Sequence, residues 1–313
     1  MRIGIDIMGG DFAPEATVLG AILAQKEMSS DDRIVLFGDQ EKIKEILDRE
    51  KVSISNFDIV HASQVIDMHD HPTKVFTKKP DSSIAKGFKY LASGEIEGFA
   101  SAGNTGAMMV GAMYTVRSIP GIIRPVITGP IPKPDGSHSI LLDVGLNPDT
   151  KPDVLYQYAI LGSIYAENVY NIKNPKVGLM NIGSEEEKGN LVTKSAHELM
   201  KDSSDFNFIG NIEANEIFTE GKADVIVCDG FVGNVILKEA EAFYTLYKQR
   251  KLQDEFFDKF NFENYGGTPV LGVNKNVVIG HGISNDVAIK NMILHTKSVV
   301  DANLSEKIKE AFK

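Results

Sequence analysis

Short apolar runs alternate with amphipathic or polar stretches along the first third of the chain. RIGIDIM, RIVLFG and FDIVHA each predict a strand, and the stretches between them predict helices from Pro14 to Ala24 and from a cap at Asp39 to about Glu50. A third helix is predicted after Pro80, in DSSIAKGFKYLASGE. Strands that alternate with helices are typical of a parallel sheet, so this part of the chain indicates an α/β fold.

The alternation continues after one interruption. GFASAGNTGAMMVGAMY predicts a strand, a glycine turn and a helix, whereas RPVITGPIP and SHSILLDVG, joined by a turn from Pro134 to Gly136, predict a β-hairpin. A helix from Pro152 to Glu167 leads to the strand VGLMNIG, and FNFIGNI and ADVIVCDGF predict two more strands before a helix from Val235 to Gln249. PVLGVNKNVVIGHG supplies the last strands, and amphipathic helices end the chain. The hairpin is expected to mark the passage between two halves or to supply an arm that faces a second copy of the chain.

The most polar of the predicted strand ends lies in GLMNIGSEEEKGN, where a helix is expected to begin near Lys188. The unpaired N–H groups of a helix start and the Lys188 ammonium together suit an anion, while Asn181 and Asn190 can orient a carbonyl or phosphate oxygen. The alternative is an ordinary solvated helix start, in which the three preceding glutamates match the helix dipole.

Two other predicted strands end in similar turns. One is SAGNTG, which contains Asn104, and the other is DGFVGN, from Asp229 to Asn234. Small residues let a ligand approach the backbone, although close helix packing uses the same glycines. If the three strands are parallel, Asn104, Lys188 and Asn234 face the same edge of the sheet, which favours a ligand site over three unrelated turns.

The first strand contains a carboxylate where an apolar residue is usual. Because a carboxylate is seldom buried without a partner, Asp6 is expected to face a cation or the open end of the sheet beside Asp11. The alternative is that Asp6 and Asp11 cap the turn that contains Gly9 and Gly10.

The composition, with 42% hydrophobic and 24% charged residues, is that of an ordinary folded protein. A chain of 313 residues is long enough for one broad domain or for two lobes that share a sheet. No apolar run is long enough to cross a bilayer, no signal peptide is evident, and the single Cys228 fits a reducing compartment, so we expect a cytoplasmic protein. The net charge of −10 argues against nucleic acid as a partner.

An acidic partner would need a local basic patch, and two are present. The first comprises lysines on one loop and helix: Lys74, Lys78, Lys79, Lys86 and Lys89. The second comprises Lys248, Arg250 and Lys251. Either patch could instead be only a solvated helix face, which is the more common case for such runs.

Familiar cofactor motifs are absent from the sequence. There is no early GxGxxG, GxxxxGK[ST], HExxH or GxSxG, and the glycines from Gly280 onward come too late for a dinucleotide site. His61, His69 and His71 lie in or just before the polar loop from Ser63 to Pro80, but no second ligand cluster accompanies them, so we predict a flexible rim and no metal.

Aromatic and charged residues mix in EAFYTLYKQRKLQDEFFDKFNFENYGG, and residues 243–266 within it predict an amphipathic helical protrusion. Such a segment can lie on a membrane surface, pack in a core or form a dimer interface. The sequence leaves all three open.

Eight blocks of the chain resemble, in order, the PlsX-type phosphate acyltransferases of bacterial phospholipid synthesis. They are MRIGIDIMGGDFAPE, KKPDSSI, SAGNTGA, LLDVGLNPDTKP, VGLMNIGSEEEKGN, FIGNIE, DVIVCDGFVGNVILK and YGGTPVLGV. The resemblance implies a three-layer α/β/α fold, a homodimer, and reversible transfer of a long-chain acyl group from acyl carrier protein to inorganic phosphate. The acyl phosphate would pass to a membrane glycerol-3-phosphate acyltransferase for phosphatidic acid synthesis. Family members commonly have a longer and more apolar helical protrusion.

Carried over by motif, the resemblance implies that Lys188 and Asn234 are catalytic. Phosphate can attack a thioester directly, so we predict no enzyme nucleophile, metal or cofactor. The basic patch from Lys74 to Lys89 is the predicted dock for the acidic carrier protein. Phosphate and acyl binding are predicted for the small and polar residues of the strand-end turns: Asp6, Gly9, Gly10, Asp11, Ser101, Gly103, Asn104, Thr105, Gly106, Asn181, Gly183, Asn190, Gly230, Gly233 and His281.

Two other functions remain open at this point. A coenzyme A-dependent enzyme of the phosphotransacetylase type would carry out the same chemistry on a short acyl group. A non-catalytic membrane scaffold for lipid synthesis would not need several glycine-rich turns with a lysine.

Overall fold

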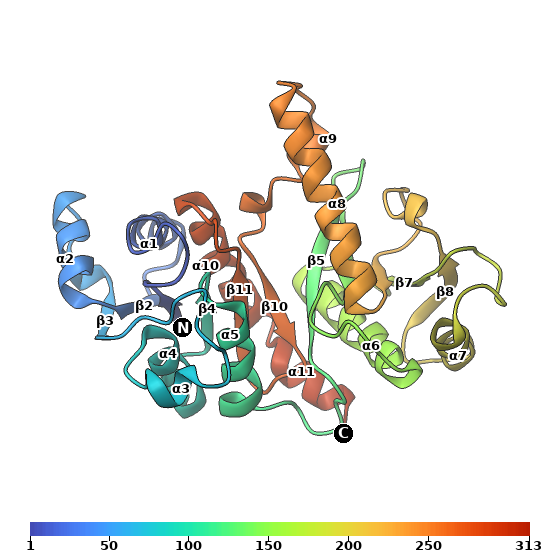
Figure 1. The fold of residues 1–313 in the computed structure, drawn as a ribbon, viewed down its shortest axis with the longest axis horizontal. Coiled ribbons are helices and arrows are strands. Elements are labelled where there is room, and N and C mark those ends of the chain that lie inside the picture. The colour runs from blue at the N-terminus through green and yellow to red at the C-terminus, as the bar shows by residue number, and fades with distance from the viewer. The chain divides into compact units, whose positions relative to one another are not determined.

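The computed structural model describes residues 1–313, which form two compact units (Figure 1). Unit 1 comprises Met1–Ile119 and Phe262–Ser305, and unit 2 comprises Pro120–Asn261 and Glu306–Lys313. Each unit is an α/β structure with its own sheet strands. The last helix, α11 (Leu304–Ala311), begins in unit 1 and ends in unit 2.

Unit 1 has the strand order β3-β2-β1-β4-β11-β10, in which neighbours are parallel except for the antiparallel pair β10 and β11. Its strands are β1 (Arg2–Asp6), β2 (Arg33–Gly38), β3 (Asp58–His61), β4 (Gly98–Ser101), β10 (Gly267–Leu271) and β11 (Asn276–Gly280). Its helices are α1 (Glu15–Glu27), α2 (Gln40–Arg49), η1 (Ile54–Asn56), α3 (Val75–Lys78), α4 (Ser83–Ser93), α5 (Thr105–Gly111), η2 (Ala112–Val116), η4 (Phe262–Asn264) and α10 (Asp286–Asp301).

Helices cover both faces of the unit 1 sheet. On one face Ile3 and Ile5 pack in a buried cluster with α1 and α10, and those helices cross so closely that a Cβ on Gly20 would come 2.5 Å from the Cβ of Ile289. On the other face the rings of Phe88 in α4 and Phe99 in β4 meet edge to face, 5.3 Å apart. The result is a three-layer arrangement.

Unit 2 has the strand order β5-β6-β9-β7-β8, with β5 and β6 antiparallel and the others parallel. Its strands are β5 (Val126–Pro132), β6 (His138–Leu142), β7 (Lys176–Met180), β8 (Asn207–Ile212) and β9 (Val225–Val227). Its helices are α6 (Pro152–Val169), α7 (Leu191–Met200), η3 (Ala214–Glu216), α8 (Gly230–Gln249) and α9 (Glu255–Asp258). The predicted hairpin and the parallel strands after it are confirmed.

Helix α6 covers one face of the unit 2 sheet, where a Cβ on Gly162 would come 2.5 Å from Val225 Cγ1. The other face is covered by the start of α8, whose Ile236 and Leu237 pack on a buried cluster that includes Leu141 and Ile226. An apolar layer therefore lies on each side of the strands, as a strand buried on both faces requires.

Two predicted helix starts are wrong. Helix α8 begins at Gly230 instead of Val235, because Asp229 accepts a hydrogen bond from Val232 N (2.8 Å) and caps the first turn. Helix α7 begins at Leu191, three residues after Lys188, because Asn190 caps it through Thr193 N (2.9 Å). Lys188 therefore lies in the preceding turn and not in the helix.

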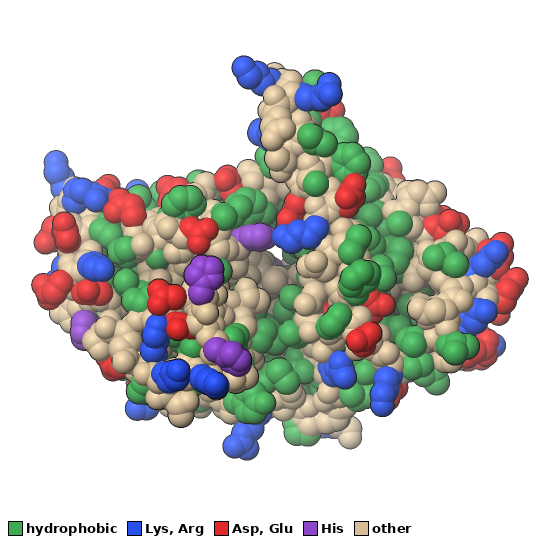
Figure 2. Space-filling view, viewed as in Figure 1, with side chains coloured by type: hydrophobic (Ala, Val, Ile, Leu, Met, Phe, Trp, Pro, Cys, Tyr) green, Lys and Arg blue, Asp and Glu red, His purple; other side chains and the backbone are tan.

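The second half of α8 and the short α9 extend past the unit 2 sheet (Figure 1). Apolar side chains follow the helix toward a tip that is rich in cations (Figure 2), and Phe243 and Leu246 are 60% and 52% exposed. At the tip, Lys248 lies 5.8 Å from the ring centres of Tyr244 and Tyr247. No helix of the protein combines the length and the apolar character needed to span a bilayer.

Candidate functional site

The predicted site residues are divided between the two units. Asn181, Gly183, Lys188, Asn190, Gly230, Gly233 and Asn234 belong to unit 2, and the other members of the predicted set belong to unit 1. Within unit 2, β7 and β9 are parallel neighbours, so the turn that carries Lys188 and the start of α8 leave the sheet at the same edge.

Backbone and amide contacts shape the turn that carries Lys188. Asn181 accepts from Ile182 N (2.9 Å) and donates to Lys188 O (3.2 Å), while Asn211 donates to Glu185 O (2.8 Å). Gly189 has φ +96° and is so enclosed that a Cβ would come 2.1 Å from Thr193 Oγ1. The side chain of Asn181 therefore helps to hold the turn, and one N–H of its amide remains available.

The Lys188 ammonium is exposed and makes no ion pair. The cap on α7 takes up Thr193 N, which leaves the N–H groups of Leu191 and Val192 without partners three and four residues beyond Lys188. A cation beside free N–H donors is an arrangement that suits an anion.

The start of α8 rests on a loop that follows β6. A Cβ on Gly233 would come 1.8 Å from Asp143 O, and Gly230 N donates to Asn147 O (2.8 Å). The Asn234 amide donates to Val144 O (3.3 Å), which leaves its second N–H available. Both glycines are therefore needed for close packing, and Asn234 is exposed beside them.

Sequence reasoning missed the residue that organises this loop. Asp143 is fully buried and accepts from the backbone N–H groups of Gly145 (3.1 Å), Leu146 (3.0 Å) and Asn147 (2.7 Å). Burial raises the pKa of the Asp143 carboxyl, and these hydrogen bonds oppose the rise. The signal was a carboxylate at the end of the apolar run SILLD, the same signal that singled out Asp6.

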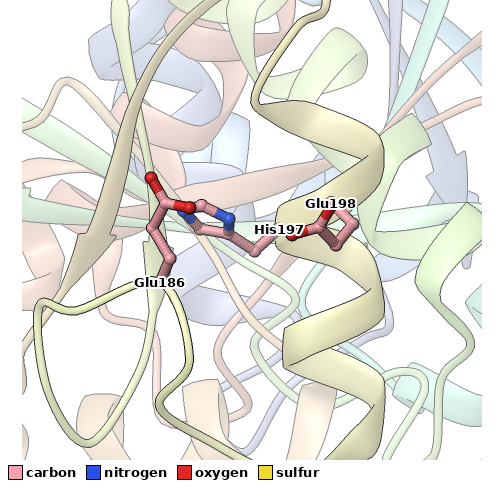
Figure 3. A group of neighbouring side chains, drawn as sticks. All are labelled: Glu186, His197 and Glu198. Atoms are coloured by element: carbon pink, nitrogen blue, oxygen red, sulfur yellow. The ribbon is translucent and has the colours of Figure 1, made fainter.

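His69 and His71 are exposed, and no group of side chains able to bind a metal forms around them. Such a group forms in unit 2 instead, where Glu186, His197 and Glu198 offer ligand atoms that all lie within 4.8 Å of one another (Figure 3).

In unit 1, β1, β4 and β11 are parallel, so their carboxyl ends open at one edge of the sheet. Asp6 at the end of β1 is 1% exposed; its Oδ2 accepts from Ser101 Oγ (2.7 Å) and its Oδ1 from Met8 N (3.0 Å). Burial raises the pKa of the Asp6 carboxyl. Asp6 caps its turn, as the alternative interpretation proposed, and no cation faces it.

The two glycine turns of unit 1 lie against each other. A Cβ on Gly9 would come 2.8 Å from Gly103 N, and Gly103 N itself donates to Ser101 Oγ (2.9 Å). Gly10 has φ +108°, and the next residue, Asp11, donates its N–H to Gly282 O (2.7 Å), beside His281. Asp11, Thr105 and His281 are exposed at this edge.

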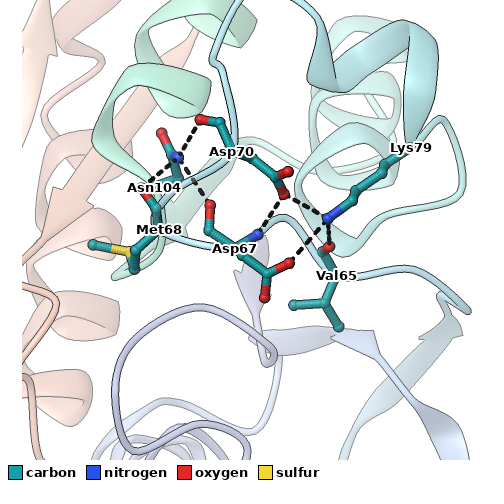
Figure 4. A network of polar contacts seen from close by, with 6 residues as sticks. All are labelled: Val65, Asp67, Met68, Asp70, Lys79 and Asn104. Atoms are coloured by element: carbon teal, nitrogen blue, oxygen red, sulfur yellow. Dashed lines mark hydrogen bonds and ion pairs between the residues drawn. The ribbon is translucent and has the colours of Figure 1, made fainter.

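Asn104 connects this edge to the polar loop between β3 and α4 (Figure 4). Its Oδ1 caps α5 through Ala107 N (2.9 Å), and its Nδ2 donates to Asp67 O (3.0 Å), Met68 O (3.2 Å) and Asp70 O (3.2 Å). The neighbouring Gly106 gives space to Pro72, 2.4 Å from where its Cβ would be. The side chain of Asn104 is therefore an anchor for the loop and has no remaining donor for a ligand.

Two lysines of the first basic patch are held in ion pairs. Lys79 pairs with Asp67 (3.0 Å) and Asp70, and Lys86 pairs with Asp81 (2.7 Å). The hydrogen bond from Lys79 lowers the pKa of the Asp70 carboxyl. Lys74, Lys78 and Lys89 are exposed and make no ion pair, so they carry the charge that this surface offers to a partner.

Solved structures of similar fold identify the structural class. A branched-chain phosphotransacylase from Enterococcus faecalis superposes with a TM-score of 0.66 over 96% of this chain and 99% of its own, at 14% identity. A phosphotransacetylase from Streptococcus pyogenes does so with a TM-score of 0.63 over 96% and 94%, at 16% identity. At such identities the likeness establishes the fold, which is that of the phosphotransacetylase-like α/β proteins.

Sequence comparison identifies the family. The model of the family described as "Fatty acid synthesis protein" matches residues 1–307. A phosphate acyltransferase from Dictyoglomus turgidum is 43% identical, with 99% of this chain and 97% of the relative covered, and one from Halothermothrix orenii is 40% identical, with 99% and 98% covered. The chain therefore belongs to this family, the PlsX-type phosphate acyltransferases, and is an acyltransferase.

Proposed function

We propose that the enzyme reversibly transfers a long-chain fatty acyl group from acyl carrier protein to inorganic phosphate. The acyl phosphate would be consumed by a membrane glycerol-3-phosphate acyltransferase in phosphatidic acid synthesis. The observation that carries the proposal is the unpaired Lys188 ammonium beside free N–H groups, in a chain whose relatives are phosphate acyltransferases.

The reaction needs no covalent intermediate with the enzyme. An oxygen of phosphate attacks the thioester carbonyl carbon, a C–O bond forms, and the π electrons move to the carbonyl oxygen. The resulting oxyanion collapses, the C–S bond breaks, and the carrier thiolate leaves with the electron pair and takes up a proton. Because phosphate is ionised at neutral pH, the enzyme's part is to hold the two reactants together and to stabilise the oxyanion.

The geometry of unit 2 supports a set of donors for these two roles. Lys188 and the N–H groups of Leu191 and Val192 would neutralise phosphate. Asn234 would donate its remaining amide hydrogen to the oxyanion, together with the N–H of Phe231, which has no partner in the first turn of α8.

In unit 1 the proposed ligand groups are the backbone of the glycine turns and the exposed side chains of Asp11, Thr105 and His281. Asp6 and Asn104 would act by holding those turns in place. This division assigns binding to side chains exposed at the sheet edge and positioning to the buried side chains whose hydrogen bonds hold the turns.

The proposed partners have separate surfaces. Acyl carrier protein would dock on Lys74, Lys78 and Lys89. The exposed apolar side chains of α8 would form a homodimer interface or rest on the cytoplasmic face of the membrane, where the acyl phosphate is used.

The experiment is to incubate the protein with palmitoyl-acyl carrier protein, with and without phosphate, to follow release of the carrier thiol, and to trap acyl phosphate with hydroxylamine. We expect release that requires phosphate, with a trapped acyl product. Release without phosphate would indicate a thioesterase and contradict the proposal.

A coenzyme A-dependent reaction is the second candidate, because the fold is that of phosphotransacetylases. Acetyl- and butyryl-coenzyme A in the same assay distinguish it. Turnover of these donors in preference to the carrier substrate would favour this candidate.

A further inference from the structure

Three side chains beside the turn that carries Lys188 place possible metal-ligand atoms close together. Glu186 precedes Lys188 by two residues, and His197 and Glu198 project from α7 (Figure 3). One imidazole and two carboxylates make a donor set that Zn²⁺ and related divalent transition metals accept.

His197 supplies an independent observation. It is 4% exposed, its ring is directed toward the Glu186 carboxylate (Figure 3), and its buried Nδ1 has no hydrogen-bond partner. Native proteins leave few buried polar atoms in this state, and a bound ion or water is a usual explanation. An imidazole nitrogen that carries no proton has a lone pair to give to a metal.

Asn211 adds a second unpartnered atom at the same turn. Its Nδ2 holds the turn through Glu185 O (2.8 Å), whereas its Oδ1 is buried and has no partner. Two buried polar atoms next to the turn, His197 Nδ1 and Asn211 Oδ1, therefore lack a hydrogen-bond partner.

A competing cation is already present. Lys201 pairs with Glu198 at 2.6 Å, and its hydrogen bond lowers the pKa of the Glu198 carboxyl. A metal ion must therefore displace Lys201. The ligand atoms lie up to 4.8 Å apart, whereas bonds of about 2.1 Å to a tetrahedral ion place its ligands about 3.4 Å apart, so the exposed glutamates must rotate inward.

We propose that Glu186, His197 and Glu198 bind one divalent transition-metal ion, which fastens the turn that carries Lys188 to helix α7. The ion is structural: it takes no part in acyl transfer, and its binding does not depend on the proposed function. Its consequence for the enzyme is a more rigid Lys188 turn, and only this consequence rests on the proposed role of Lys188.

The test uses the full chain and Co²⁺ as a spectroscopic probe, followed by Zn²⁺ competition. We expect a visible absorption band typical of low-coordinate Co²⁺, lost on addition of Zn²⁺. Glu186→Gln, at an exposed position, should weaken binding by about 10-fold or more, as should His197→Gln. Lys201→Gln should tighten binding because it removes the competitor. His71→Gln is the matched control and should change nothing.

Hydrogen exchange gives the second readout. Zn²⁺ should slow amide exchange in the segment 182–190 of the wild type and not of Glu186→Gln. Absence of saturable metal binding, or binding that Glu186→Gln leaves unchanged, would overturn the proposal and leave a water molecule as the partner of His197. An inactive enzyme that still binds Co²⁺ in this way would instead count against the proposed function alone.

Discussion

At the scale of single residues, the same device occurs twice: a buried carboxylate at the end of a strand receives hydrogen bonds from the turn that follows. Asp6 does so for the turn after β1, and Asp143 for the loop after β6. The sequence marked Asp6 as unusual, yet it could not decide between a ligand and a cap, because both need a carboxylate at the strand end. The decision depends on whether backbone N–H groups reach it, which only the folded turn shows.

Lys188 is the residue whose loss should affect chemistry most. Its ammonium makes no ion pair and its side chain is exposed, so Lys188→Ala should leave folding intact. If Lys188 and Asn234 act as proposed, we expect turnover to fall about 100-fold or more in Lys188→Ala, because its charge would stabilise the transition state, and to fall similarly in Asn234→Ala. Steady-state kinetics with a thermal melt on each variant measures both effects.

Lys194→Ala is the control for charge, because Lys194 is exposed on the neighbouring α7. It should retain near-normal turnover. If Lys188→Ala kept activity similar to that of Lys194→Ala, the assignment of Lys188 would be wrong.

Asp6 should contribute to the pH dependence of the free energy of unfolding. Burial raises the pKa of the Asp6 carboxyl above 3.8, so this carboxyl binds a proton more readily in the folded protein than in the unfolded chain. Its contribution to the free energy of unfolding is therefore largest at low pH and decreases as pH rises above 3.8. Asn has no carboxyl to titrate, so Asp6→Asn removes this pH dependence, and it also removes part of the hydrogen bonding to Ser101 and Met8. The variant should therefore be less stable than the wild type, with a deficit that is larger at pH 4 than at pH 7.

Urea unfolding at several pH values tests this, with Asp31→Asn, an exposed carboxylate, as the control. A deficit that grows as pH rises would mean that the hydrogen bonds from Ser101 and Met8 outweigh burial and lower the pKa.

At the scale of elements, the hydrophobic pattern predicted the strands and the hairpin well, because strands buried on both faces leave an unmistakable apolar run. Helix starts were predicted less well. DGFVGN contains two glycines, which normally indicate a turn. Here they form the first turn of α8, because Gly230 lets the helix approach Asn147 and Gly233 lets it approach Asp143. Both neighbours are remote in sequence, so no local pattern could reveal them.

The polar loop before α4 was predicted to be a flexible rim, and Asn104 shows how it is held. Asn104→Ala removes the α5 cap and the donor for three loop carbonyls, so we expect a loss of about 2 kcal/mol in the free energy of unfolding. Hydrogen exchange in the segment 64–72 should speed up.

Asn104→Asp separates the two roles, because a carboxylate can still cap Ala107 N but places a negative charge against the three carbonyls. It should release the loop while α5 stays protected. If exchange in the segment 64–72 stayed at the wild-type rate in both variants, the loop would be held by other contacts, such as those of Lys79.

At the scale of the whole molecule, charge is the property that sequence alone described least well. From the sequence, the five lysines from Lys74 to Lys89 were predicted to form one basic patch. Whether each lysine is paired depends on which carboxylates lie next to it in the folded protein. Lys79 and Lys86 are paired, so the surface offers three free cations on a protein with a net charge of −10. If the carrier protein docks on this surface as proposed, the attraction therefore depends on Lys74, Lys78 and Lys89.

Reversing these three charges to Glu should raise the Michaelis constant for the carrier substrate by about 10-fold at low salt while turnover stays unchanged, because the charges act on encounter and not on the reacting atoms. The effect should shrink as salt is raised. Arg250→Glu with Lys251→Glu, on the second basic patch at the end of α8, is the matched control. If that control raised the Michaelis constant and the triple variant did not, the carrier protein would dock on the end of α8. An effect of either variant that did not depend on salt would mean that docking is not electrostatic.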